Sequence, residues 1–393
     1  MNNKAVYITH AKRTAIGSFM GSLSAISAVR LGAHVIKNIV DESRIDPKIV
    51  DEVILGHVIT GGLGQNPARQ ALIEAGLSVT VPGYVVSEVC GSGLKAINLA
   101  AASIMTGASE IIIVGGQENM SLGMHASYIR AGTKFGENKM IDLTQQDGLK
   151  DAFSNAAMGL TAENIVELFG ISRDQQDEFA LNSHLKAHRA TVAGMFEQEI
   201  APIETKVKKD AIIFKHDETI RSTSTIELLA KLPAVFKQNG SVTAGNSSPI
   251  SDGSAAMLLA SEQAMFENNL IPLVRIVSFA NTGVEPNIMG IGPISAASKA
   301  LSLAGWKVED LDLIEVNEAF AAASIYVNQQ MKWDINKVNV CGGAIALGHP
   351  IGASGARILV TLIHQMKKTN AKKGLATMCI GGGMGIAICI ENV

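Results

Sequence analysis

Short apolar runs alternate with longer amphipathic stretches along the first third of the chain. The runs are rich in β-branched residues and predict strands, whereas the amphipathic stretches have the spacing of helices. The predicted strands are residues 5–9, 52–55, 84–89 and 110–114, and the predicted helices include residues 28–43 and 94–105. This alternation favours a mainly parallel sheet with helices on its faces, an α/β fold.

The C-terminal third repeats this plan. Strands are predicted at residues 273–279, 312–316, 337–340, 375–379 and 385–390, and helices near residues 295–303 and 354–366. The pair VD at 50–51 precedes one predicted strand as LD at 311–312 precedes another, an offset of 261 residues (311 minus 50). The pair SG at 92–93 opens a helix as SG at 354–355 does, at an offset of 262 (354 minus 92). We infer a duplicated α/β unit whose two helix N-termini share a site.

The stretch between the halves, residues 120–245, is more polar, carries most of the charge runs and is helix-rich around residues 174–191. Long structureless loops are rare inside compact domains, so this insertion predicts a third folded unit that covers a site. We therefore predict an N-terminal half at residues 1–119, to which residues 246–270 return, and a C-terminal half at residues 271–393.

The composition narrows the class of protein. Of 393 residues, 47% are hydrophobic and 18% charged, and 38 are glycine, which is typical of a tightly packed α/β protein. A net charge of -3 leaves no overall positive field for a nucleic-acid backbone. The densest basic run, KVKK at 206–209, is interpreted as a solvated loop, with contact to an anionic ligand as the alternative.

Targeting and cysteine usage point to the cytoplasm. The first ten residues turn polar before an apolar run reaches signal-peptide length, and no later segment offers about 18 uninterrupted apolar residues, so we expect no membrane partner. The four cysteines are too sparse for a disulfide framework, and we expect free thiols. They are Cys90, Cys341, Cys379 and Cys389, of which the last falls in a strand-like run and is expected in the core.

Cys90 lies between the predicted strand at 84–89 and a helix that opens at GSG (91–93). Unpaired N–H groups and the helix dipole favour a thiolate there, which suits a nucleophile, although many cysteines are simply small buried hydrophobic residues. The stretch GSGLKA at 91–96 also fits a dinucleotide-binding pattern and hence an oxidoreductase. Against this, the next strand ends in GGQ (115–117), without an acid for a ribose.

Two further candidates lie in glycine-rich turns. His349 is part of GHPIGASG (348–355), where Pro350 keeps it out of the following helix. The sequence is compatible with two roles for His349, a proton carrier or a structural histidine. Cys379 precedes IGGGMG (380–385), where backbone N–H groups could approach a ligand oxygen. The alternative for these glycines is a plain hairpin loop between buried strands.

Asn317 and Glu318 follow the predicted strand at 312–316, at the edge where open α/β sheets place ligands. Either could hold a catalytic water, and Asn317 could instead cap the helix at 321–329. His184 and His188 have the i, i+4 spacing of metal ligands, but no third ligand is near in sequence. We interpret them as a polar helix face and predict no metal site.

Four motifs occur in order: VCGSG (89–93), NEAF (317–320), GHPIGASG (348–355) and CIGGG (379–383). Further stretches accompany them: GQNPARQ (64–70), TAEN (161–164), TAGN (243–246) and MGIGP (289–293). Together they resemble the thiolases over nearly the whole chain, most closely the biosynthetic acetyl-CoA acetyltransferases of that family.

This resemblance implies the thiolase fold, a duplicated five-layer α-β-α-β-α core with an inserted loop domain, assembled as homodimers or homotetramers. It implies a reversible condensation of two acetyl-CoA molecules to acetoacetyl-CoA and coenzyme A. Cys90 would carry the acyl group, His349 would take its proton, and Cys379 would deprotonate the second acetyl-CoA. Asn317 would hold a water in one oxyanion hole, and the N–H groups of Cys90 and Gly381 would form the other. Coenzyme A thioesters would be substrates, and no cofactor is expected.

The resemblance also implies the residues that bind coenzyme A. Arg221 would lie at its adenine end and Ser248 at its pantetheine. The pantetheine and acyl pocket would be formed by Leu149, Met158, Phe236, Ala244, Met289, Ala319 and Phe320. Residues 130–140 and 147–149 would belong to a covering loop, which favours short acyl chains.

Three positions depart from the family pattern: Ala157 replaces a usual histidine, Pro249 a glycine and Cys341 a common asparagine. The first two lie in the expected pantetheine channel and could change affinity or chain-length choice. The alternatives are a degradative 3-ketoacyl-CoA thiolase of broader chain length, a ketoacyl-carrier-protein synthase and a non-catalytic acyl-CoA-binding protein.

Overall fold

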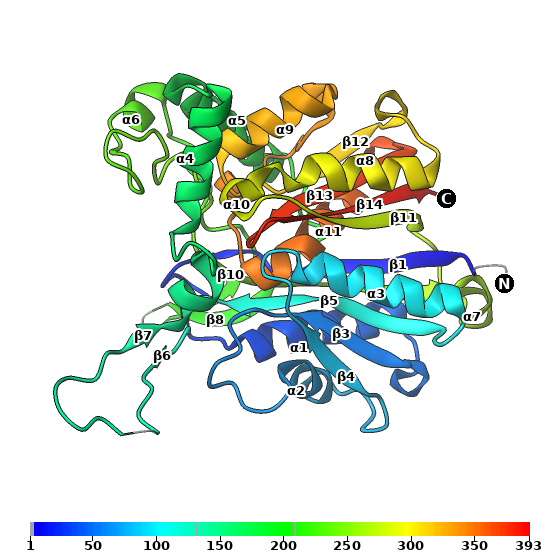
Figure 1. Ribbon diagram of the computed structural model, residues 1–393. Coiled ribbons are helices and arrows are strands. Elements are labelled where there is room, and N and C mark those ends of the chain that lie inside the picture. Colours follow the sequence, from blue (N-terminus) through cyan, green and yellow to red (C-terminus); the bar gives the residue numbers. More distant parts are fainter. Residues whose placement is uncertain (1–3, 131, 208–209) are drawn as a thin grey trace.

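The computed structural model describes residues 4–130, 132–207 and 210–393 (Figure 1). Residues 1–3, Ala131 of the predicted covering loop, and Lys208 and Lys209 of the predicted basic run lie outside the described residues. Every catalytic or substrate-binding residue predicted from the sequence falls inside them.

The N-terminal half forms one side of a large mixed sheet. Its neighbouring strands are, in order, β1 (Val6–Arg13), β10 (Ser251–Ser261), β5 (Ile111–Asn119), β3 (Glu52–Gly56) and β4 (Gly83–Val86). β3 runs parallel to β4 and β5, and β10 lies antiparallel between β5 and β1 although it follows the insertion. On the outer face lie α1 (Ala28–Ser43) and α2 (Pro67–Glu74), whose apolar side chains share a buried cluster with those of the strands.

The C-terminal half repeats this arrangement. Its neighbouring strands are β11 (Val274–Gly283), β14 (Met384–Asn392), β13 (Lys373–Ile380) and β12 (Leu313–Val316). The β12–β13 pair is parallel, as the β3–β5 pair is in the first half, and the β11–β14 and β13–β14 pairs are antiparallel. On the outer face lie α8 (Gly292–Ala304) and α9 (Ala321–Met331). The order and directions of these four strands match those of β1, β10, β5 and β3, which confirms the duplication.

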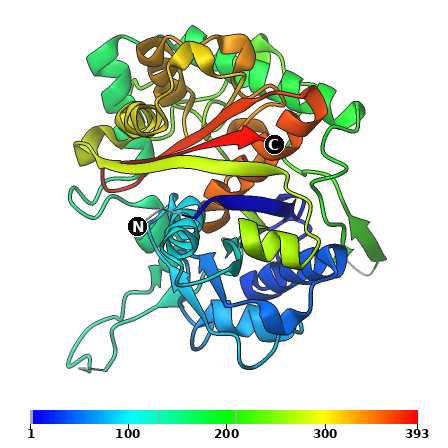
Figure 2. The same cartoon turned by 90° about the vertical axis from the view of Figure 1, so that its right-hand side faces the viewer.

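The two sheet halves join where β1 pairs with β11, which gives a sheet of ten strands that includes β2 (Gly17–Ser18) beside β10. Between the halves lie the central helices α3 (Ser92–Thr106) and α11 (Ile351–Thr369) (Figures 1 and 2). Outer helices, sheet, central helices, sheet and outer helices are the five layers predicted. By hydropathy the stretch Val89–Thr106 could also cross a membrane, but α3 packs here against α11 and β5.

The central helices touch through a matched pair of glycines. A Cβ atom on Gly93 would lie 2.9 Å from the backbone nitrogen of Ala356, and one on Gly355 would lie 2.4 Å from that of Leu94. Each helix therefore presents a glycine to the backbone of the other. The two SG pairs that first indicated the duplication lie at this crossing.

Most predicted elements are present, with shifted ends, but the strand predicted at 337–340 is wrong. The segment instead holds the short helix η5 (Ile335–Lys337) and a single bridge between Val338 and Ile314. The reason is Asn339, whose side chain accepts from the N–H of Val316 and donates to its carbonyl, both at 2.8 Å. One side-chain amide thus replaces the backbone pairing that another strand would give to β12.

The insertion folds over one end of the sheet (Figure 1). Its elements are β6 (His125–Ala126), β7 (Ile141–Asp142), the π-helical turn η2 (Thr144–Leu149), α4 (Met158–Phe169), α5 (Arg173–Val192), β8 (Ile203–Val207), β9 (Asp210–Phe214) and α6 (Ile226–Ala230). The remaining short helices are η1 (Pro47–Ile49), α7 (Glu262–Glu267), η3 (Pro286–Ile291), η4 (Val308–Asp310) and α10 (Ala344–Leu347).

The arm between β6 and β7 does not cover the site as predicted. It projects away from the body of the molecule (Figure 1), and the side chains of Tyr128 and Phe135 are 91% and 100% exposed. Of the predicted covering loop, only the end near Leu149 lines the cavity described below. At the root of the arm, β6 pairs with β7, and Ser121 donates to Asp252 of β10.

Candidate active site

Cys90 lies in a tight turn between β4 and α3. Val89 has a φ of 47°, a left-handed conformation that β-branched residues strongly disfavour, and no other β-branched residue in the described part of the chain has a positive φ. The Ser92 hydroxyl holds the turn, since it donates to the carbonyl of Val89 at 2.6 Å and accepts from the N–H of Glu88 at 2.8 Å. Strain of this kind is typical of functional sites. The turn fixes the Cys90 sulfur at the N-terminus of α3.

Burial raises the pKa of the Cys90 thiol to about 11. The backbone N–H groups of Gly381 and of Cys90 itself hydrogen-bond the sulfur and oppose this rise in pKa, while the charge of Glu118 adds to it. Burial thus opposes the thiolate that the helix N-terminus favours, and the thiolate stays a prediction. The two N–H groups that the family resemblance assigns to an oxyanion hole do meet at this sulfur.

Cys379 lies near the end of β13, just before the turn 381–383 that leads into β14. Gly382 and Gly383 have φ values of 85° and 86°, which allow this tight hairpin turn and bring the N–H of Gly381 to Cys90. Burial and then the neighbouring thiol of Cys90 raise the pKa of Cys379 to about 12. The glycines thus form a hairpin loop, and the N–H of Gly381 in this loop lies at the sulfur of Cys90.

His349 lies between α10 and α11, where Pro350 is the N-cap of α11. The Ser354 hydroxyl donates to the carbonyl of Pro350 at 2.8 Å and lies 2.6 Å from His349 Nδ1. Because the hydroxyl proton is used on Pro350, Ser354 accepts from Nδ1–H, which leaves Nε2 as the free base. Burial and then the charge of Arg357 lower the pKa of His349 to about 3, so the imidazole is neutral.

Asn317 reaches His349 from the end of β12. Its Nδ2 lies 3.4 Å from His349 Nε2, and its backbone N–H donates to Thr377 at 3.1 Å. The helix α9 has Phe320 at its N-cap, so Asn317 does not cap it. Its buried Oδ1 has no hydrogen-bond partner in the described part of the chain. That this amide holds a water stays a prediction.

Glu318 points away from this group. Its buried carboxylate accepts from the Ser183 hydroxyl at 2.6 Å, from Asn339 Nδ2 at 2.9 Å and from the N–H of Ile345 at 3.3 Å. These bonds tie α5, the segment around residue 339 and α10 together. The hypothesis that Glu318 could hold a catalytic water is therefore wrong, because its oxygens are committed to structure.

A cavity of about 470 Å³ opens onto Cys90 and His349. It is lined by most of the residues that the resemblance assigned to the acyl and pantetheine pocket: Leu149, Met158, Phe236, Ser248, Met289, Ala319 and Phe320. The rest of its wall was not assigned to the pocket from the sequence: Gln145, Gly148, Lys150, Asn155, Gly159, Ser247, Ile250 and Ile351. Ala157 also lines it, where the missing histidine would lie.

Arg221 and Ala244 line a neighbouring cavity of about 420 Å³ instead. The two cavities share Ser247 and Ile250. A long ligand that begins at Cys90 can therefore continue past Ser247 toward the guanidinium of Arg221. Pro249 lines this second cavity, between the two shared residues.

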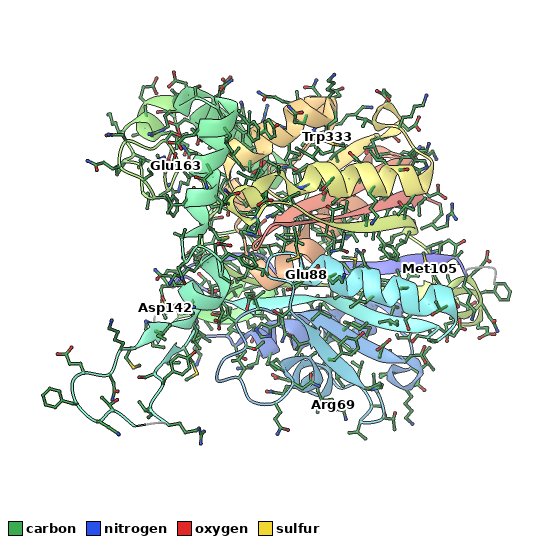
Figure 3. The ribbon with its side chains drawn as sticks, in the orientation of Figure 1. Arg69, Glu88, Met105, Asp142, Glu163 and Trp333 are labelled. Carbon is green, nitrogen blue, oxygen red and sulfur yellow. The ribbon has the colours of Figure 1, made fainter. Side chains whose placement is uncertain are left out.

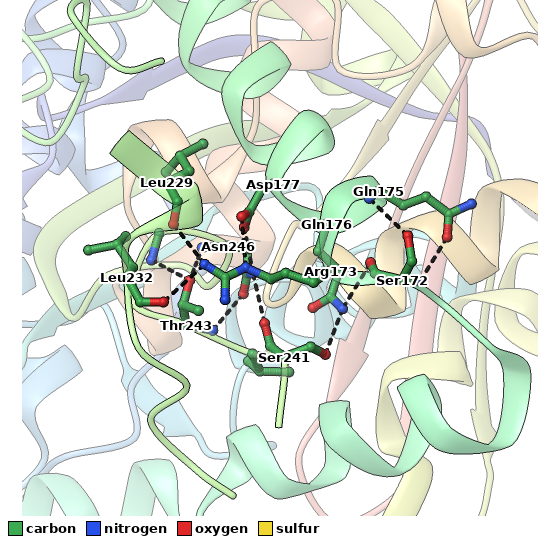
Figure 4. A network of polar contacts seen from close by, with 12 residues as sticks. Ser172, Arg173, Gln175, Gln176, Asp177, Leu229, Leu232, Ser241, Thr243 and Asn246 are labelled. Atoms are coloured by element: carbon green, nitrogen blue, oxygen red, sulfur yellow. Dashed lines mark hydrogen bonds and ion pairs between the residues drawn. The ribbon is translucent and has the colours of Figure 1, made fainter. Parts of the chain in front are cut away.

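A polar network holds the loop 243–248 that supplies these residues (Figure 4). Asp177 of α5 accepts from Asn246 Nδ2 at 3.0 Å and from Arg173 Nε at 2.7 Å. Asn246 Oδ1 in turn accepts from the N–H of Thr243 at 2.8 Å. The insertion thus positions the loop from a helix that does not itself line the first cavity.

Two other sequence candidates have structural roles. His184 Nδ1 accepts from the N–H of Arg221 at 3.2 Å, and burial followed by the charge of Arg221 lowers the pKa of His184 to about 4. Within residues 4–130, 132–207 and 210–393, no group of three or more His, Cys, Asp or Glu side chains could hold a metal ion, so His184 and His188 have no third ligand there. Cys341 is buried among apolar side chains of the α10 region, and nothing in the structure explains its substitution.

The glycine-rich turn before α3 is not a dinucleotide site. A Cβ atom on Gly93 would lie 2.9 Å from the nitrogen of Ala356 and 3.0 Å from the oxygen of Gly352. A pyrophosphate would need to approach this glycine closely, but α11 already fills that space. The dinucleotide interpretation is therefore wrong.

Comparison with known proteins places this geometry in a family. The model described as thiolase, N-terminal domain, matches residues 6–263, and the model described as thiolase, C-terminal domain, matches residues 270–392. Among curated relatives, the acetyl-CoA acetyltransferase of Chromobacterium violaceum is 53% identical over 389 residues, which cover 98% of this chain and 99% of that protein. That of Escherichia coli is 50% identical over 392 residues, 99% of this chain and 100% of that protein.

Solved structures agree. The crystal structure of the acetyl-CoA acetyltransferase of Bacillus anthracis is 43% identical, covers 100% of both chains and has a TM-score of 0.97. Human mitochondrial 3-ketoacyl-CoA thiolase in complex with CoA is 39% identical, with a TM-score of 0.95 over 99% of this chain and 98% of that one. The predicted resemblance is confirmed, and this chain belongs to the thiolase family.

Proposed function

We propose that this chain is an acetyl-CoA C-acetyltransferase, which condenses two acetyl-CoA molecules reversibly to acetoacetyl-CoA and coenzyme A. The observation that carries the proposal is that Cys90 and the neutral imidazole of His349 line one cavity, while the thiol of Cys379 lies close enough to Cys90 for the two to interact. Relatives about half identical over the full length are named acetyl-CoA acetyltransferase, which supports it. The chemistry divides into two halves.

In the first half, Cys90 becomes acetylated. Because burial disfavours charge, the Cys90 proton moves to His349 Nε2 as the sulfur attacks the acetyl carbon. The N–H groups of Cys90 and Gly381 stabilise the negative oxygen of the tetrahedral intermediate. The bond between the acetyl carbon and the coenzyme A sulfur breaks, and coenzyme A leaves with the proton of Cys379. The site then holds an imidazolium and a thiolate, with no net charge.

In the second half, the Cys379 thiolate removes a proton from the methyl group of another acetyl-CoA. The enolate oxygen faces the Nε2–H of His349 and the water that we propose on Asn317. The carbanion attacks the acetyl carbon on Cys90, the carbon–sulfur bond breaks, and Cys90 takes its proton back from His349. Side chains, backbone N–H groups and thioester substrates supply every step, so we propose that no metal or other cofactor is needed.

Mass spectrometry and product analysis after incubation with acetyl-CoA test both halves. We expect one acetyl group on Cys90 in the wild type, slower acetylation of Cys90 in Cys379→Ala because the departing coenzyme A loses its proton donor, and none in Cys90→Ala. Only the wild type and the control variant Cys389→Ala, which changes a buried strand cysteine outside the cavity, should release acetoacetyl-CoA. Full condensation by folded Cys90→Ala would refute the proposal, and a wild type without covalent acetyl would favour a non-catalytic acyl-CoA-binding protein.

A degradative 3-ketoacyl-CoA thiolase of broader chain length is the second candidate, because a human relative with that name has nearly the same fold. Ala157 favours it further, since a small residue in the cavity wall leaves room beside the acyl group. Thiolysis rates for 3-ketoacyl-CoA substrates of four to ten carbons decide between the two. A steep fall beyond four carbons supports the acetyltransferase.

We also propose that the enzyme is cytoplasmic and acts as a homodimer or homotetramer. The family membership and the exposed apolar side chains of the arm between β6 and β7 support an oligomer. Sedimentation velocity of the full chain gives the number of subunits.

A further inference from the structure

A buried carboxylate that takes no part in the proposed steps lies beside the site. Glu118 is near the end of β5, and its side chain is fully buried. Its Oε2 accepts from the N–H of Gly352 at 2.9 Å and from that of Val58 at 3.1 Å, and its Oε1 accepts from the N–H of Ile59 at 3.2 Å. Burial of a charged carboxylate at this depth costs free energy unless hydrogen bonds compensate the loss of hydration.

Each of these donors belongs to a segment that carries part of the site. Gly352 is in the first turn of α11, three positions after His349. Val58 and Ile59 belong to the apolar cluster against which Cys90 packs. One carboxylate thus joins the segment of the base to the segment that supports the nucleophile.

The N-terminus of α11 explains why a carboxylate is placed here. A helix N-terminus has unpaired N–H groups and a partial positive charge, which a capping side chain normally satisfies. The N-cap of α11 is Pro350, which supplies no side-chain hydrogen bond. Glu118 provides the missing acceptor from a different strand, far away in the sequence.

Close packing leaves this group little freedom. A Cβ atom on Gly352 would lie 2.7 Å from Glu118 Oε2 and 2.9 Å from the Cα of His57. His57 Nε2 lies 3.3 Å from Glu118 Oε1, and His57 Nδ1 lies 3.2 Å from the side-chain amide of Gln117. A small movement of the carboxylate would therefore be passed on to α11.

We propose that Glu118 is a positioning residue of the reaction, which holds the first turn of α11, and with it His349, at a fixed distance from Cys90 and its supporting loop. The inference rests on the proposed function and adds to it a residue that touches neither substrate nor reacting atoms. Its charge has a second consequence, since it lies near enough to Cys90 to disfavour the thiolate.

Two substitutions separate the geometry from the charge. Glu118→Gln removes the charge and turns one acceptor into a donor facing N–H groups, and Glu118→Asp keeps the charge but shortens its reach. We expect both to lower kcat for acetoacetyl-CoA formation by about tenfold or more, with a smaller change in KM, because misplaced reacting groups slow the chemistry.

Glu118→Gln alone should move the pH midpoint of Cys90 alkylation by iodoacetamide to lower pH, as measured on the peptide that contains Cys90. The other titratable groups that face Cys90 are Cys379 and His349, and they are the same in both variants.

Glu163→Gln is the matched control. Glu163 of α4 (Figure 3) is also a buried carboxylate that accepts backbone N–H groups, from Ser241 and Val242 at 2.8 to 3.1 Å, but it does not bond to α11 or to the 58–59 loop. It should lower stability and leave the alkylation profile of Cys90 unchanged.

Wild-type kcat in both Glu118 variants, or an unshifted alkylation midpoint in Glu118→Gln, overturns the inference. If Glu118→Gln does not fold, Glu118→Asp decides through the split between kcat and KM. A wild type that makes no acetoacetyl-CoA refutes the proposed function instead, and alkylation of Cys90 needs no turnover and still tests Glu118.

Discussion

In both halves of the chain a residue with a positive φ precedes the residue proposed to be catalytic, but one half uses a valine there and the other a glycine. Cys90 follows Val89, with a φ of 47°, and His349 follows Gly348, with a φ of 106°. Each catalytic residue then precedes the first turn of a central helix. Glycine adopts a positive φ without strain, whereas valine does so only at a cost.

The surroundings explain the difference. A Cβ atom on Gly348 would lie 2.6 Å from Ser251 Oγ and 2.7 Å from Ile16 Cγ2, so no side chain fits there. The side chain of Val89 instead packs beside Gly381, whose Cβ, if present, would lie 3.3 Å from Val89 Cγ1. The turn before His349 thus has no room for a side chain, whereas the turn before Cys90 uses a side chain to pack against Gly381, whose N–H lies at the sulfur.

The largest effect on activity is expected for a substitution of His349 itself. His349→Asn should lower kcat by roughly 10²–10⁴, the usual contribution of a general acid–base group. Because the pKa of His349 is about 3, its imidazole stays neutral through pH 5–9, and we expect no loss of wild-type activity near pH 6.5 from its titration. A pH profile of kcat measures this, and an acid limb near 6.5 that disappears in the variant would contradict it.

His349 also makes the stability of the folded protein depend on pH. Its folded pKa lies below its ordinary value of 6.5, so between pH 6.5 and about 3 the unfolded chain binds a proton that the folded chain does not. Acidification through this window therefore destabilises the wild type more than His349→Asn. Urea unfolding at pH 7 and pH 5 measures the difference between the two proteins.

Gly348→Ala should have the next largest effect. The new methyl group meets Ser251 and Ile16 as well as the unfavourable φ, so we expect a loss of about 2–4 kcal/mol in stability and a fall of about 10² in kcat, as His349 is displaced. Gly170→Ala is the control, because Gly170 has a φ of 68° with nothing within 4 Å of its Cβ position. That variant should lose only about 1 kcal/mol and no activity. Equal losses in the two variants would show that space at Gly348 is unimportant.

Much of the fold could be predicted because local pattern and global structure agree. The helix predicted at residues 28–43 is found with those ends, and the SG pairs found by their spacing lie at the crossing of α3 and α11. The failure at residues 337–340 has a physical cause. An apolar run can supply a strand, but the side chain of Asn339 occupies the hydrogen-bonding edge of β12, and nothing in the run itself indicates that contact.

Residues of the site that belong to sequence motifs could be predicted, whereas residues that act through contacts between distant parts of the chain could not. Cys90 and His349 lie in glycine-rich turns and Cys379 just before one, and these motifs stand out in the sequence, whereas Glu118 lies in an apolar strand and gains its contacts only from folding. The strand predicted at residues 84–89 extends too far, because a valine at position 89, after a β-branched run, predicts more strand. β4 ends at Val86, since the turn that presents Cys90 overrides the local preference.

Val89→Gly should have the smallest effect on stability and still lower activity. Relief of strain, about 1–3 kcal/mol, offsets the lost packing of the side chain and the greater freedom of glycine in the unfolded chain, so we expect a net change within about 1 kcal/mol. The value of kcat should fall several-fold, because the Cys90 turn loosens and Gly381 loses its neighbour, and Val89→Ala should lie between Val89→Gly and the wild type. Urea unfolding and steady-state kinetics give the two numbers for each variant. If Val89→Gly were as active as the wild type, the strained valine would have no part in presenting the nucleophile, and the two halves would differ only in how crowded their turns are.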